Sequence, residues 1–503
     1  MILLIQNHDE YDADFRAMLQ AFFPTVKIYG MKTEEAGRLS AKDFRKYDIC
    51  FTALLLEEKA RLTIEKNGIT QFMALCDGDY KDRRHFRNKL KLAMYRVLSE
   101  YTERTLPWGS LTGMRPTKIA IKAFKTGKNK EEVIDIYRKL YDTSKEKALL
   151  AAEVAQREKI ILSDVDPERD YALYIGIPFC PTRCLYCSFA AVPIAEYESI
   201  VNEYLESLKS ELQYISMQSS NRKLISIYIG GGTPTSLSAK QLDILLTAVD
   251  ETFDITSLQE YTVEAGRPDS ITIEKLRVLK NHNVSRISIN PQTMNEETLR
   301  IIGRYHTSSD IVRAFWDARK TGFRDINMDI IAGLPGEDMH SMRYTLDEIE
   351  KLSPDSLTVH SLAIKKTANL NQELDQYKDA INHDAVGMVR MAHERAEKLG
   401  LVPYYLYRQR NIAGNLENTG FVKPGLECRY NILIMEERID IYAAGAGAVS
   451  RLVTYDRKSD TNVKTIRVEN LKNIEEYIVR IDEMKERFDK ALNERRKLYN
   501  ELS

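Results

Sequence analysis

The pattern of apolar and polar positions divides the chain into parts of different character. The N-terminal part carries short strand-like runs, among them the alternating Arg61–Lys66 and the apolar Cys50–Leu56. From about Asp82 to Leu162 the apolar positions recur with helical spacing, with few breaking residues. The acidic, polar stretch Ser163–Asp170 then reads as a domain boundary. The sequence therefore predicts an N-terminal α+β and helical domain over residues 1–165.

From Tyr171 onward, strand-like runs alternate regularly with helical stretches. The predicted strands are Tyr171–Ile177, Leu224–Ile229, Glu260–Ala265, Ser285–Asn290, Asp325–Ala332 and Ser356–Leu362. The clearest helices between them are Tyr197–Met217, Ala239–Thr252 and Ser309–Thr321. Such alternation favours βαβ units and a parallel sheet. We expect an α/β fold in which six units form an open partial barrel over residues 166–400, with the chemistry in the loops after the strands.

After the last predicted strand the pattern changes, and residues 401–503 are expected to extend the core and end in a charged helical tail. A helical stretch, Lys365–Leu399, precedes a strand-like run, Val402–Arg408, and a Gly-rich segment, Tyr442–Ser450. The charged tail from Asn470 to Ser503 predicts a solvated amphipathic helix rather than a partner-facing one. The sequence thus predicts a short, mostly helical C-terminal region.

Composition and charge exclude several classes of function. Lys plus Arg number 73 and Asp plus Glu 74, which leaves no global electrostatic case for binding nucleic acid or an anionic membrane. The basic stretch Lys81–Lys91 is better explained as a charged helix face. The apolar start Met1–Ile5 is too short for a signal peptide, and no run is long enough to cross a bilayer. Six cysteines suit a reducing cytoplasm, with Cys50 and Cys76 as buried hydrophobic residues.

Three cysteines lie within eight residues, with the spacing C-x-x-x-C-x-x-C. Cys180, Cys184 and Cys187 can each hold a different iron of a four-iron cubane, which normally takes four thiolates. No fourth cysteine lies nearby, so one iron would stay open for the amine and carboxylate of S-adenosylmethionine. A structural zinc site is the alternative, but it needs four closed ligands, and the next cysteine is Cys428. The spacing favours the start of a radical S-adenosylmethionine enzyme.

A glycine-rich segment, Gly230–Thr235, directly follows the second predicted strand. Glycines let backbone groups approach a ligand closely, so this segment could clamp the methionine amino group. The alternatives are a tight turn or a phosphate loop, and the segment lacks the Lys-Ser/Thr of the latter. The later Gly445–Ser450 only loosely resembles a dinucleotide loop, and we reject that interpretation.

Polar residues lie at or beyond the ends of the later strands. Glu264 ends the third strand, where it could bind a ribose or an amine; a surface ion pair is the alternative. Gln292 and Arg304 follow the fourth strand. Asp329 lies inside an apolar strand, and burying its charge is unfavourable unless it is paired or binds a ligand. The eight histidines show no metal-ligand spacing.

Between Tyr171 and Arg451 the chain resembles the oxygen-independent coproporphyrinogen III dehydrogenases, which are radical S-adenosylmethionine enzymes. Leu106–Thr117 and Gly414–Gly420 make it most similar to the HemZ type. The positions that match the motifs of this family, in chain order, are Tyr174, Cys180, Cys184, Tyr186, Cys187, Gly231, Gly232, Thr233, Glu264, Gln292, Arg304, Asp329, Ala363 and Val449.

The resemblance implies a 4Fe–4S cluster on the three cysteines and two S-adenosylmethionine molecules. The molecule on the cluster would contact Tyr174, Tyr186, Gly231, Glu264 and Val449. The second would contact Gly232, Thr233, Gln292, Arg304, Asp329 and Ala363. The implied reaction is oxidative decarboxylation of two propionates of coproporphyrinogen III, with a reduced flavodoxin or ferredoxin as electron donor. The candidates for propionate binding, chosen by location alone, are Arg183, Arg267 and Arg408.

Two departures from the family keep other functions open. Phe189 stands where the best-established dehydrogenases carry a further cysteine, and the heme chaperones share this feature. Those chaperones carry a His-Asn-x-x-Tyr-Trp segment, whereas Tyr430–Met435 here has neither histidine nor tryptophan. The alternatives are therefore a heme chaperone or another radical reaction on a tetrapyrrole. No pattern assigns a role to residues 1–165.

Overall fold

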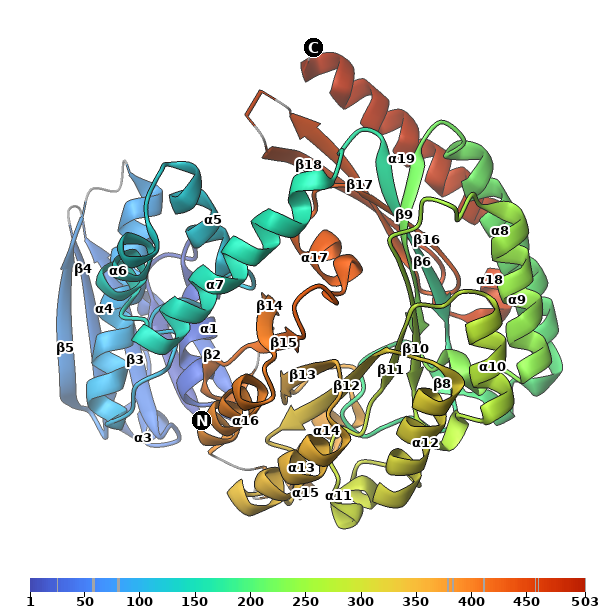
Figure 1. The fold of residues 1–503 in the computed structure, drawn as a ribbon. Coiled ribbons are helices and arrows are strands. Elements are labelled where there is room, and N and C mark those ends of the chain that lie inside the picture. The colour runs from blue at the N-terminus through green and yellow to red at the C-terminus, as the bar shows by residue number, and fades with distance from the viewer. Residues whose placement is uncertain are drawn as a thin grey trace.

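Two β-sheets organise the chain (Figure 1). The computed structural model describes residues 1–24, 26–56, 59–78, 82–377, 380–381, 384–409, 412–456, 458–459 and 461–502. Lys81 of the predicted basic stretch lies outside these residues, as do four positions of the predicted helical stretch 365–399. In the part of the chain that is described, no helix is both long and apolar enough to span a membrane.

The N-terminal sheet has five strands in the order β2-β1-β3-β4-β5. Their bounds are β1 (Ile2–Gln6), β2 (Ile28–Lys32), β3 (Ile49–Leu56), β4 (Lys59–Lys66) and β5 (Ile69–Asp77). The accompanying helices are α1 (Asp12–Phe22), α2 (Thr33–Ala36), α3 (Ala41–Phe44) and α4 (Arg83–Thr102). Phe15 of α1 and Leu98 of α4 pack on Phe51 of β3 in one core. Both strand-like runs predicted here are confirmed as β3 and β4.

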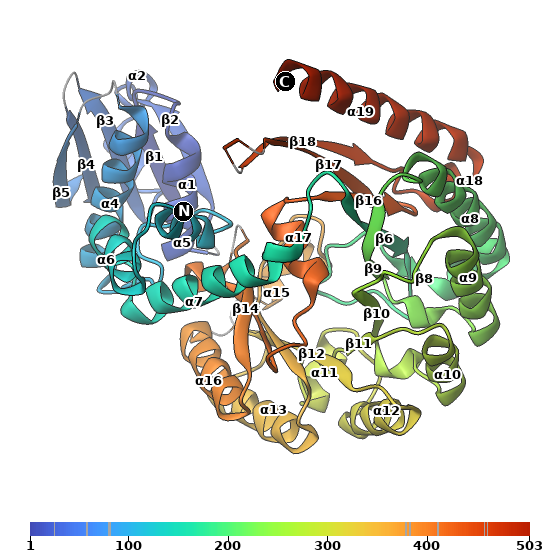
Figure 2. The same cartoon turned by 45° about the horizontal axis from the view of Figure 1, so that its top comes forward.

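A helical segment links this sheet to the rest of the molecule. It comprises α5 (Thr117–Lys125), α6 (Lys130–Tyr141), α7 (Lys145–Ile161) and the short 3-10 helix η1 (Leu162–Asp164). Asn129 begins α6 by accepting a hydrogen bond from the Glu132 amide. In Figures 1 and 2, α7 runs from the N-terminal elements toward the large sheet. The predicted helical pattern before Leu162 is confirmed, and a strand begins at Asp170.

The six predicted strands run parallel to one another within the large sheet, in the order β6-β9-β10-β11-β12-β13. Their bounds are β6 (Asp170–Ile177), β9 (Lys223–Gly231), β10 (Glu260–Gly266), β11 (Arg286–Ile289), β12 (Asp325–Ala332) and β13 (Ser356–Ser361). All six predicted strands are confirmed. The described strands pair from β14 at one edge to β18 at the other without closing, which gives an open partial barrel.

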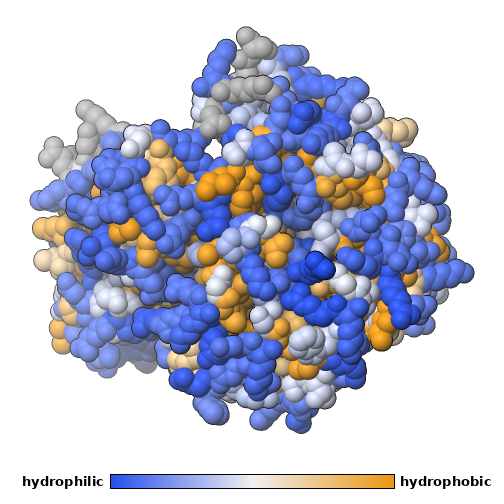
Figure 3. Space-filling model, in the orientation of Figure 1, coloured by the Kyte–Doolittle hydropathy of each residue, from blue (hydrophilic) through white to orange (hydrophobic). Residues whose placement is uncertain are grey.

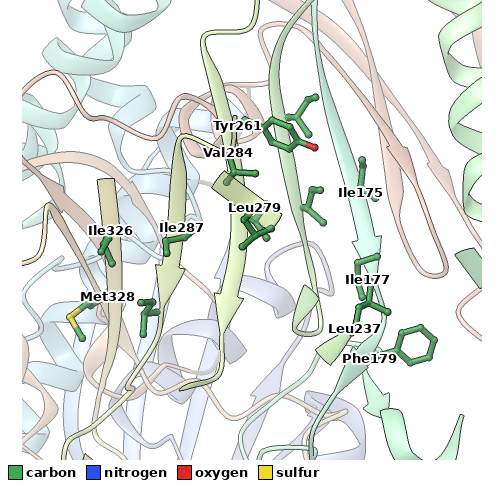
Figure 4. Close-up of a cluster of buried hydrophobic side chains, with 14 of the residues drawn as sticks. Ile175, Ile177, Phe179, Leu237, Tyr261, Leu279, Val284, Ile287, Ile326 and Met328 are labelled. Atoms are coloured by element: carbon green, nitrogen blue, oxygen red, sulfur yellow. The ribbon is translucent and has the colours of Figure 1, made fainter. Parts of the chain in front are cut away.

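Helices cover the outer face of this curved sheet (Figure 2). They are α8 (Val201–Gln218), α9 (Ala239–Thr252), α10 (Ile273–Asn281), α11 (Glu296–Ile301), α12 (Ser308–Thr321), α13 (Met339–Leu352) and α16 (Ala385–Lys398). Side chains on alternate strand positions face these helices, and Ile175, Ile287 and Met328 belong to one apolar core (Figure 4). The other positions face the inside of the barrel.

Short elements complete the connections between these strands and helices. They are β7 (Phe179–Cys180), β8 (Val192–Pro193), η2 (Ile194–Glu196), η3 (Glu198–Ile200), η4 (Pro234–Ser236), η5 (Pro268–Ser270), α14 (Asn369–Gln372), α15 (Leu374–Tyr377) and η6 (Ala413–Asn415). Figure 3 shows hydrophilic residues over most of one face of the molecule, with hydrophobic residues in small groups between them.

The C-terminal region differs from the predicted mostly helical segment, because it contributes five strands to the large sheet. They are β14 (Val402–Tyr407), β15 (Asn418–Val422), β16 (Asp440–Ala444), β17 (Val449–Asp456) and β18 (Thr461–Glu469). The helices of this region are α17 (Arg429–Glu436), α18 (Ile474–Val479) and α19 (Ile481–Leu502). The sequence analysis predicted β14 but missed the other four strands. Strands β15 and β16 are short and buried on both faces, and so show no alternation. The amphipathic tail is confirmed as α19, whose Phe488 and Leu492 are buried.

Candidate active site

The three predicted cluster ligands lie at the carboxyl end of β6. Cys180 ends the short strand β7, and Cys184 and Cys187 follow in the same loop, with Cys184 only 8% exposed. The loop is fixed to its neighbours by backbone bonds. The Leu185 amide donates to the Ile302 carbonyl at 3.0 Å, and the Leu370 amide donates to the Leu185 carbonyl at 2.9 Å. The cysteines are thus held on a loop that two other segments support.

Cationic side chains surround Cys184. Arg267 donates to its Sγ at 3.6 Å, and Arg304 lies close enough to interact with the same thiol. Burial opposes ionisation of Cys184, but the two guanidinium groups outweigh it and hold its pKa below the ordinary value. Burial raises the pKa of Cys180 to about 11, although its Sγ lies 3.4 Å from the Thr233 hydroxyl. Cations beside a thiol favour the thiolate, which is the form that binds metal.

The cysteines do not form a single-ion site. Among the described residues, no three His, Cys, Asp or Glu side chains are grouped so that they could hold one metal ion. In a four-iron cubane each cysteine binds a different iron, so the thiolates need not converge on one point. The three cysteines therefore fit a cubane as a donor set.

The glycine segment forms a cradle beside the cysteine loop. The amides of Gly232 and Thr233 donate to the carbonyls of Ile177 and Phe179, both at 2.7 Å. A Cβ added to Gly232 would lie 2.5 Å from the Phe179 carbonyl oxygen, so only glycine fits. Gly231 has φ +107°, which side chains rarely adopt. This packing joins the glycine segment to the cysteine loop without intervening side chains.

Glu264 lies between the glycine segment and the inside of the barrel. Its carboxylate accepts a hydrogen bond from Tyr228 Oη at 2.5 Å, and it forms no ion pair among the described residues. Burial raises the pKa of Glu264 to about 7, and the nearby Asp329 adds to that rise. A surface ion pair therefore does not describe this residue. Near neutral pH the Glu264 carboxyl can therefore donate a hydrogen bond to a polar ligand when protonated, and accept one when ionised.

Asp329 is paired, as its apolar surroundings require. Asn327 Nδ2 donates to its carboxylate at 2.7 Å, and His360 Nε2 lies 3.6 Å from the same group. Burial opposes the charge, but hydrogen bonds from His360 and Asn327 hold the pKa of Asp329 below its ordinary value. The sequence pointed to Asp329 but missed His360 on β13, because a lone histidine in a strand carries no local signal.

Among the residues that the structure describes, several buried polar atoms at this edge of the sheet have no protein partner. They include Gln292 Oε1, Asn290 Oδ1 and Arg304 Nε. The Gln292 amide donates to the Asp329 carbonyl at 2.9 Å, and the Gln292 carbonyl accepts from the Ile331 amide at 3.0 Å. Gln292 also has φ +66°, a strained conformation for a residue other than glycine. Unsatisfied buried groups require a partner, so a polar ligand fits here.

Aromatic rings line the inner face next to these polar groups. Tyr174 of β6 stacks on Tyr228 of β9 with ring centroids 6.2 Å apart, and Tyr228 stacks on Tyr430 of α17 at 4.5 Å. Tyr186 lies within the cysteine loop and interacts with the Cys184 thiol. A Cβ on Gly231 would lie 3.3 Å from Tyr174 Oη. Tyr186 thus contacts a cysteine, and Tyr174 lies against the glycine segment.

The two remaining predicted residues lie at the margins of the site. Ala363 follows β13 and pairs with Ile412 in an isolated bridge. Val449 opens β17, directly after the loop whose Gly445 amide donates to Glu211 at 2.8 Å.

The basic candidates for propionate binding have other partners. Arg408 is 3% exposed, and its guanidinium donates to the Leu111 carbonyl at 2.6 Å and lies over the Trp108 ring. It therefore anchors the N-terminal helices to the end of β14, where Tyr407 pairs with Asn418 and Asn418 accepts from the Ser361 amide at the carboxyl end of β13. Arg267 pairs with Asp269 at 2.7 Å, while Arg183 is exposed and donates to the Thr367 carbonyl at 2.8 Å.

Comparisons with known proteins agree with this geometry. The Radical SAM superfamily profile matches residues 174–349. The chain is 42% identical over 374 residues to the oxygen-independent coproporphyrinogen-III oxidase-like protein HemZ of Bacillus subtilis, covering 74% of this chain and 75% of HemZ. It is 33% identical over 282 residues to the heme chaperone HemW of Lactococcus lactis, covering 56% of this chain and 69% of HemW.

A solved structure shares the fold. The coproporphyrinogen III oxidase HemN of Escherichia coli, described as a radical SAM enzyme, superposes with a TM-score of 0.52 at 22% identity, over 68% of this chain and 74% of HemN. A cysteine loop, a glycine cradle and unsatisfied polar groups meet at one end of this barrel. The chain belongs to the radical S-adenosylmethionine enzymes, in the group of oxygen-independent coproporphyrinogen III oxidase-like proteins that includes HemZ, a family that implies a 4Fe–4S cluster and S-adenosylmethionine.

Proposed function

We propose that this protein oxidatively decarboxylates two propionates of coproporphyrinogen III to vinyl groups, giving protoporphyrinogen IX. One observation carries the proposal: the cysteine loop packs against the glycine cradle, with Cys180 Sγ 3.4 Å from Thr233 Oγ1. The name of the Bacillus subtilis relative supports the tetrapyrrole substrate.

The roles of the site residues are part of this proposal. Cys180, Cys184 and Cys187 would hold the 4Fe–4S cluster. Tyr174, Tyr186, Gly231, Glu264 and Val449 would bind S-adenosylmethionine on the cluster. Gly232, Thr233, Gln292, Arg304, Asp329 and Ala363 would bind a second molecule. When bound, the cluster and S-adenosylmethionine supply the chemistry that removes a hydrogen atom from the propionate side chain.

The residues of the chain position the reactants and control their surroundings. The ring stack of Tyr174, Tyr228 and Tyr430 gives the inner wall a rigid apolar surface against which a flat macrocycle can lie. Glu264, with a pKa near 7, can hold a proton while accepting from Tyr228. Fixing one C–H bond of the substrate in place is an orientation task, and it suits groups held on strands rather than on mobile loops.

We also propose how the chain divides and what supplies electrons. Residues 166–400 would form the catalytic barrel, and residues 401–503 would complete its sheet. Residues 1–165 would form a separate domain, which Arg408 and the buried pair of Lys147 and Glu417, 2.8 Å apart, tie to the barrel. The electron that cleaves S-adenosylmethionine would come from a reduced flavodoxin or ferredoxin. Each propionate would lose one hydrogen atom to the cofactor, then release carbon dioxide and pass one electron to an external one-electron acceptor.

The test is anaerobic incubation of the reconstituted protein with S-adenosylmethionine, reduced flavodoxin and coproporphyrinogen III, followed by mass analysis of the porphyrins. Two successive losses of the mass of formic acid, each absent in Cys184→Ala, are expected. Formation of 5′-deoxyadenosine without any change in the porphyrin would keep a radical reaction and reject this substrate. A different change of mass would point to another reaction on the tetrapyrrole.

A heme chaperone is the second candidate, favoured by Phe189 and by the similarity to the Lactococcus lactis protein. Phe189 is 67% exposed beside Cys187. Tyr430, at the start of the segment where the chaperones carry histidine, is enclosed in the tyrosine stack. Stoichiometric heme binding without porphyrin turnover in the same preparation would favour the chaperone.

A further inference from the structure

Arg267 directly follows β10 at the carboxyl end of the large sheet, and its backbone is fixed there. Its amide donates to the Ala265 carbonyl at 2.6 Å, and the Ser270 hydroxyl donates to its carbonyl at 2.7 Å. The Thr235 hydroxyl donates to the same Ala265 carbonyl at 2.8 Å. The side chain of Arg267 therefore extends from a rigid turn.

The guanidinium of Arg267 joins Asp269 to the cysteine loop. Its Nε and Nη2 donate to the two carboxylate oxygens of Asp269 at 2.9 and 2.7 Å. Its Nη1 donates to Thr182 Oγ1 at 3.0 Å and to Cys184 Sγ at 3.6 Å. The side chain is only 3% exposed, so water has little access to these bonds.

Asp269 sets the direction in which Arg267 donates. A guanidinium is planar, and a carboxylate bound along the Nε and Nη2 edge fixes that plane, which gives the remaining nitrogen, Nη1, a defined direction. The fully buried His306 supports the carboxylate, with its Nδ1 3.6 Å from Asp269 Oδ1. The contact between Arg267 and Cys184 thus follows from the pairing of Arg267 with Asp269.

The neighbouring arginines are placed differently. Arg304 donates to the Asn290 carbonyl and is one of the proposed contacts of the second S-adenosylmethionine. Arg183 is exposed and donates to the Thr367 carbonyl. Arg267 is buried and bonded at both ends, which suits it to act on the cysteine loop rather than on a propionate.

A hydrogen bond to a ligating sulfur affects the reduction of an iron–sulfur cluster. Reduction adds one negative charge, which an N–H donor and a positive guanidinium stabilise, and hydrogen bonds to the sulfurs are one of the factors that set the potential. The interaction is screened less when it is buried. A buried arginine at Cys184 therefore favours uptake of an electron.

We propose that Arg267, oriented by Asp269, donates a hydrogen bond to the Cys184 sulfur of the bound 4Fe–4S cluster and raises the reduction potential of that cluster. This inference rests on the proposed function, which places the cluster on the three cysteines. The affected step is the transfer of one electron from reduced flavodoxin or ferredoxin to the cluster, which oxidises the donor by one electron. Arg267 contacts a cluster ligand, and Asp269 acts through Arg267 as a positioning residue.

The experiment is an anaerobic redox titration of the reconstituted full-length protein without S-adenosylmethionine or tetrapyrrole. Electron paramagnetic resonance of the reduced cluster gives the midpoint potential. The variants are Arg267→Met, Asp269→Asn and the control Arg286→Met, which removes a buried arginine at the amino end of the same barrel. Loss of the hydrogen bond in Arg267→Met should shift the equilibrium roughly tenfold toward the oxidised cluster, a fall of about 59 mV for one electron.

Asp269→Asn separates orientation from charge. Removal of a negative charge near the cluster would by itself raise the potential. We expect a fall instead, because an asparagine amide cannot accept from both nitrogens of Arg267, and the contact with Cys184 is then lost. Arg286→Met should keep the wild-type potential even though it lowers the stability of the protein.

Three results would overturn the inference. They are an unchanged midpoint potential in Arg267→Met, a raised potential in Asp269→Asn, and an equal fall in Arg286→Met, because a general loss of positive charge would then explain the effect. If Arg267→Met does not retain its iron, the direction of the shift in Asp269→Asn decides alone. Iron content and thermal unfolding of each variant show that the comparison is made on folded, cluster-loaded protein.

The titration and the porphyrin assay can fail independently. A lowered potential in Arg267→Met and Asp269→Asn, with no change in the porphyrin, would support the inference and reject the substrate. An unchanged potential in Arg267→Met, with two decarboxylations by the wild type, would reject the inference and keep the proposed function. Stoichiometric zinc in place of iron in the wild-type protein would reject both.

Discussion

The outer and inner faces of the parallel strands carry different kinds of side chain. The outer positions are apolar and include Ile175, Ile227, Val263, Ile287 and Met328. The inner positions at the same strands include Tyr174, Tyr228, Glu264, Ser288 and Asp329. The outer face buries its apolar surface against the helices and supplies most of the stability. The inner face can therefore carry polar side chains that are available to bind ligands.

The inner face itself differs between its two ends. At the amino end, Arg286 pairs with Asp325 at 2.6 Å and donates to Ser356 Oγ at 2.7 Å, while Glu260 accepts from Thr262 at 3.0 Å. At the carboxyl end, Gln292 Oε1 and Asn290 Oδ1 lack partners. Most polar side chains named at the amino end thus pair with one another, although Ser226 Oγ has no partner among the described residues. The carboxyl end is the end where ligands are expected in parallel barrels.

The largest effect is expected from Cys184→Ala at the carboxyl end. This change should abolish cluster binding and 5′-deoxyadenosine formation, because a thiolate ligand is lost. Iron content and product analysis measure both. The matched control is Cys428→Ala, a buried cysteine near the amino end of the barrel, which should keep its cluster and lose about 1–3 kcal/mol of unfolding free energy. Loss of the cluster in both variants would contradict the difference between the two ends.

Arg286→Met tests the amino end directly. Removing the guanidinium leaves Asp325 and Glu260 buried without their cation, which should lower the unfolding free energy by about 3–5 kcal/mol. Denaturant unfolding of the apoprotein measures it. A variant as stable as wild type would show that the contacts of Arg286 do not contribute to the stability of the protein.

Ile287→Ala tests the outer face against the inner one. The cavity left in the apolar core should lower the unfolding free energy by about 2–5 kcal/mol, with S-adenosylmethionine binding retained below the melting temperature.

Gln292→Ala should behave in the opposite way, because the side-chain oxygen of Gln292 has no partner among the described residues. We expect near wild-type unfolding and weaker S-adenosylmethionine binding. Equal destabilisation by both changes would remove the distinction between the faces.

Glu211 is a buried residue of helix α8 that should make the free energy of unfolding depend on pH. It accepts from the Gly445 amide at 2.8 Å and from Tyr477 Oη, and burial raises its pKa from 4.5 to about 7. Because the pKa in the folded state is raised, its contribution to stability is complete below about pH 4.5 and is lost as the pH rises through 7, by up to about 3 kcal/mol. Unfolding of wild type and Glu211→Gln between pH 5 and 8 should show that the difference between them depends on pH. Parallel curves would contradict this.

The sequence predicted the parallel strands well, because their outer positions are consistently apolar and helices separate them. Asp325–Ala332 and Ala239–Thr252 were predicted with the observed bounds. The cysteine motif was equally visible, since all three ligands lie in one loop. Local pattern therefore suffices where the contacts are local.

Pairings between distant segments could not be predicted from the sequence. His360 meets Asp329 only because β12 and β13 are neighbours in the sheet. Arg408 donates to the carbonyl of Leu111, 297 residues earlier in the chain. These features follow from the tertiary fold and leave no periodic trace in the sequence.

The measurement that most directly tests a three-cysteine cluster with one open iron is electron–nuclear double resonance on the reduced, reconstituted protein. S-adenosylmethionine would be labelled with nitrogen-15 in the amino group and oxygen-17 in the carboxylate. We predict hyperfine coupling of both labels to the cluster, with neither coupling present in Cys184→Ala. A cluster that couples to neither label, or stoichiometric zinc in place of iron, would contradict the assignment of this site.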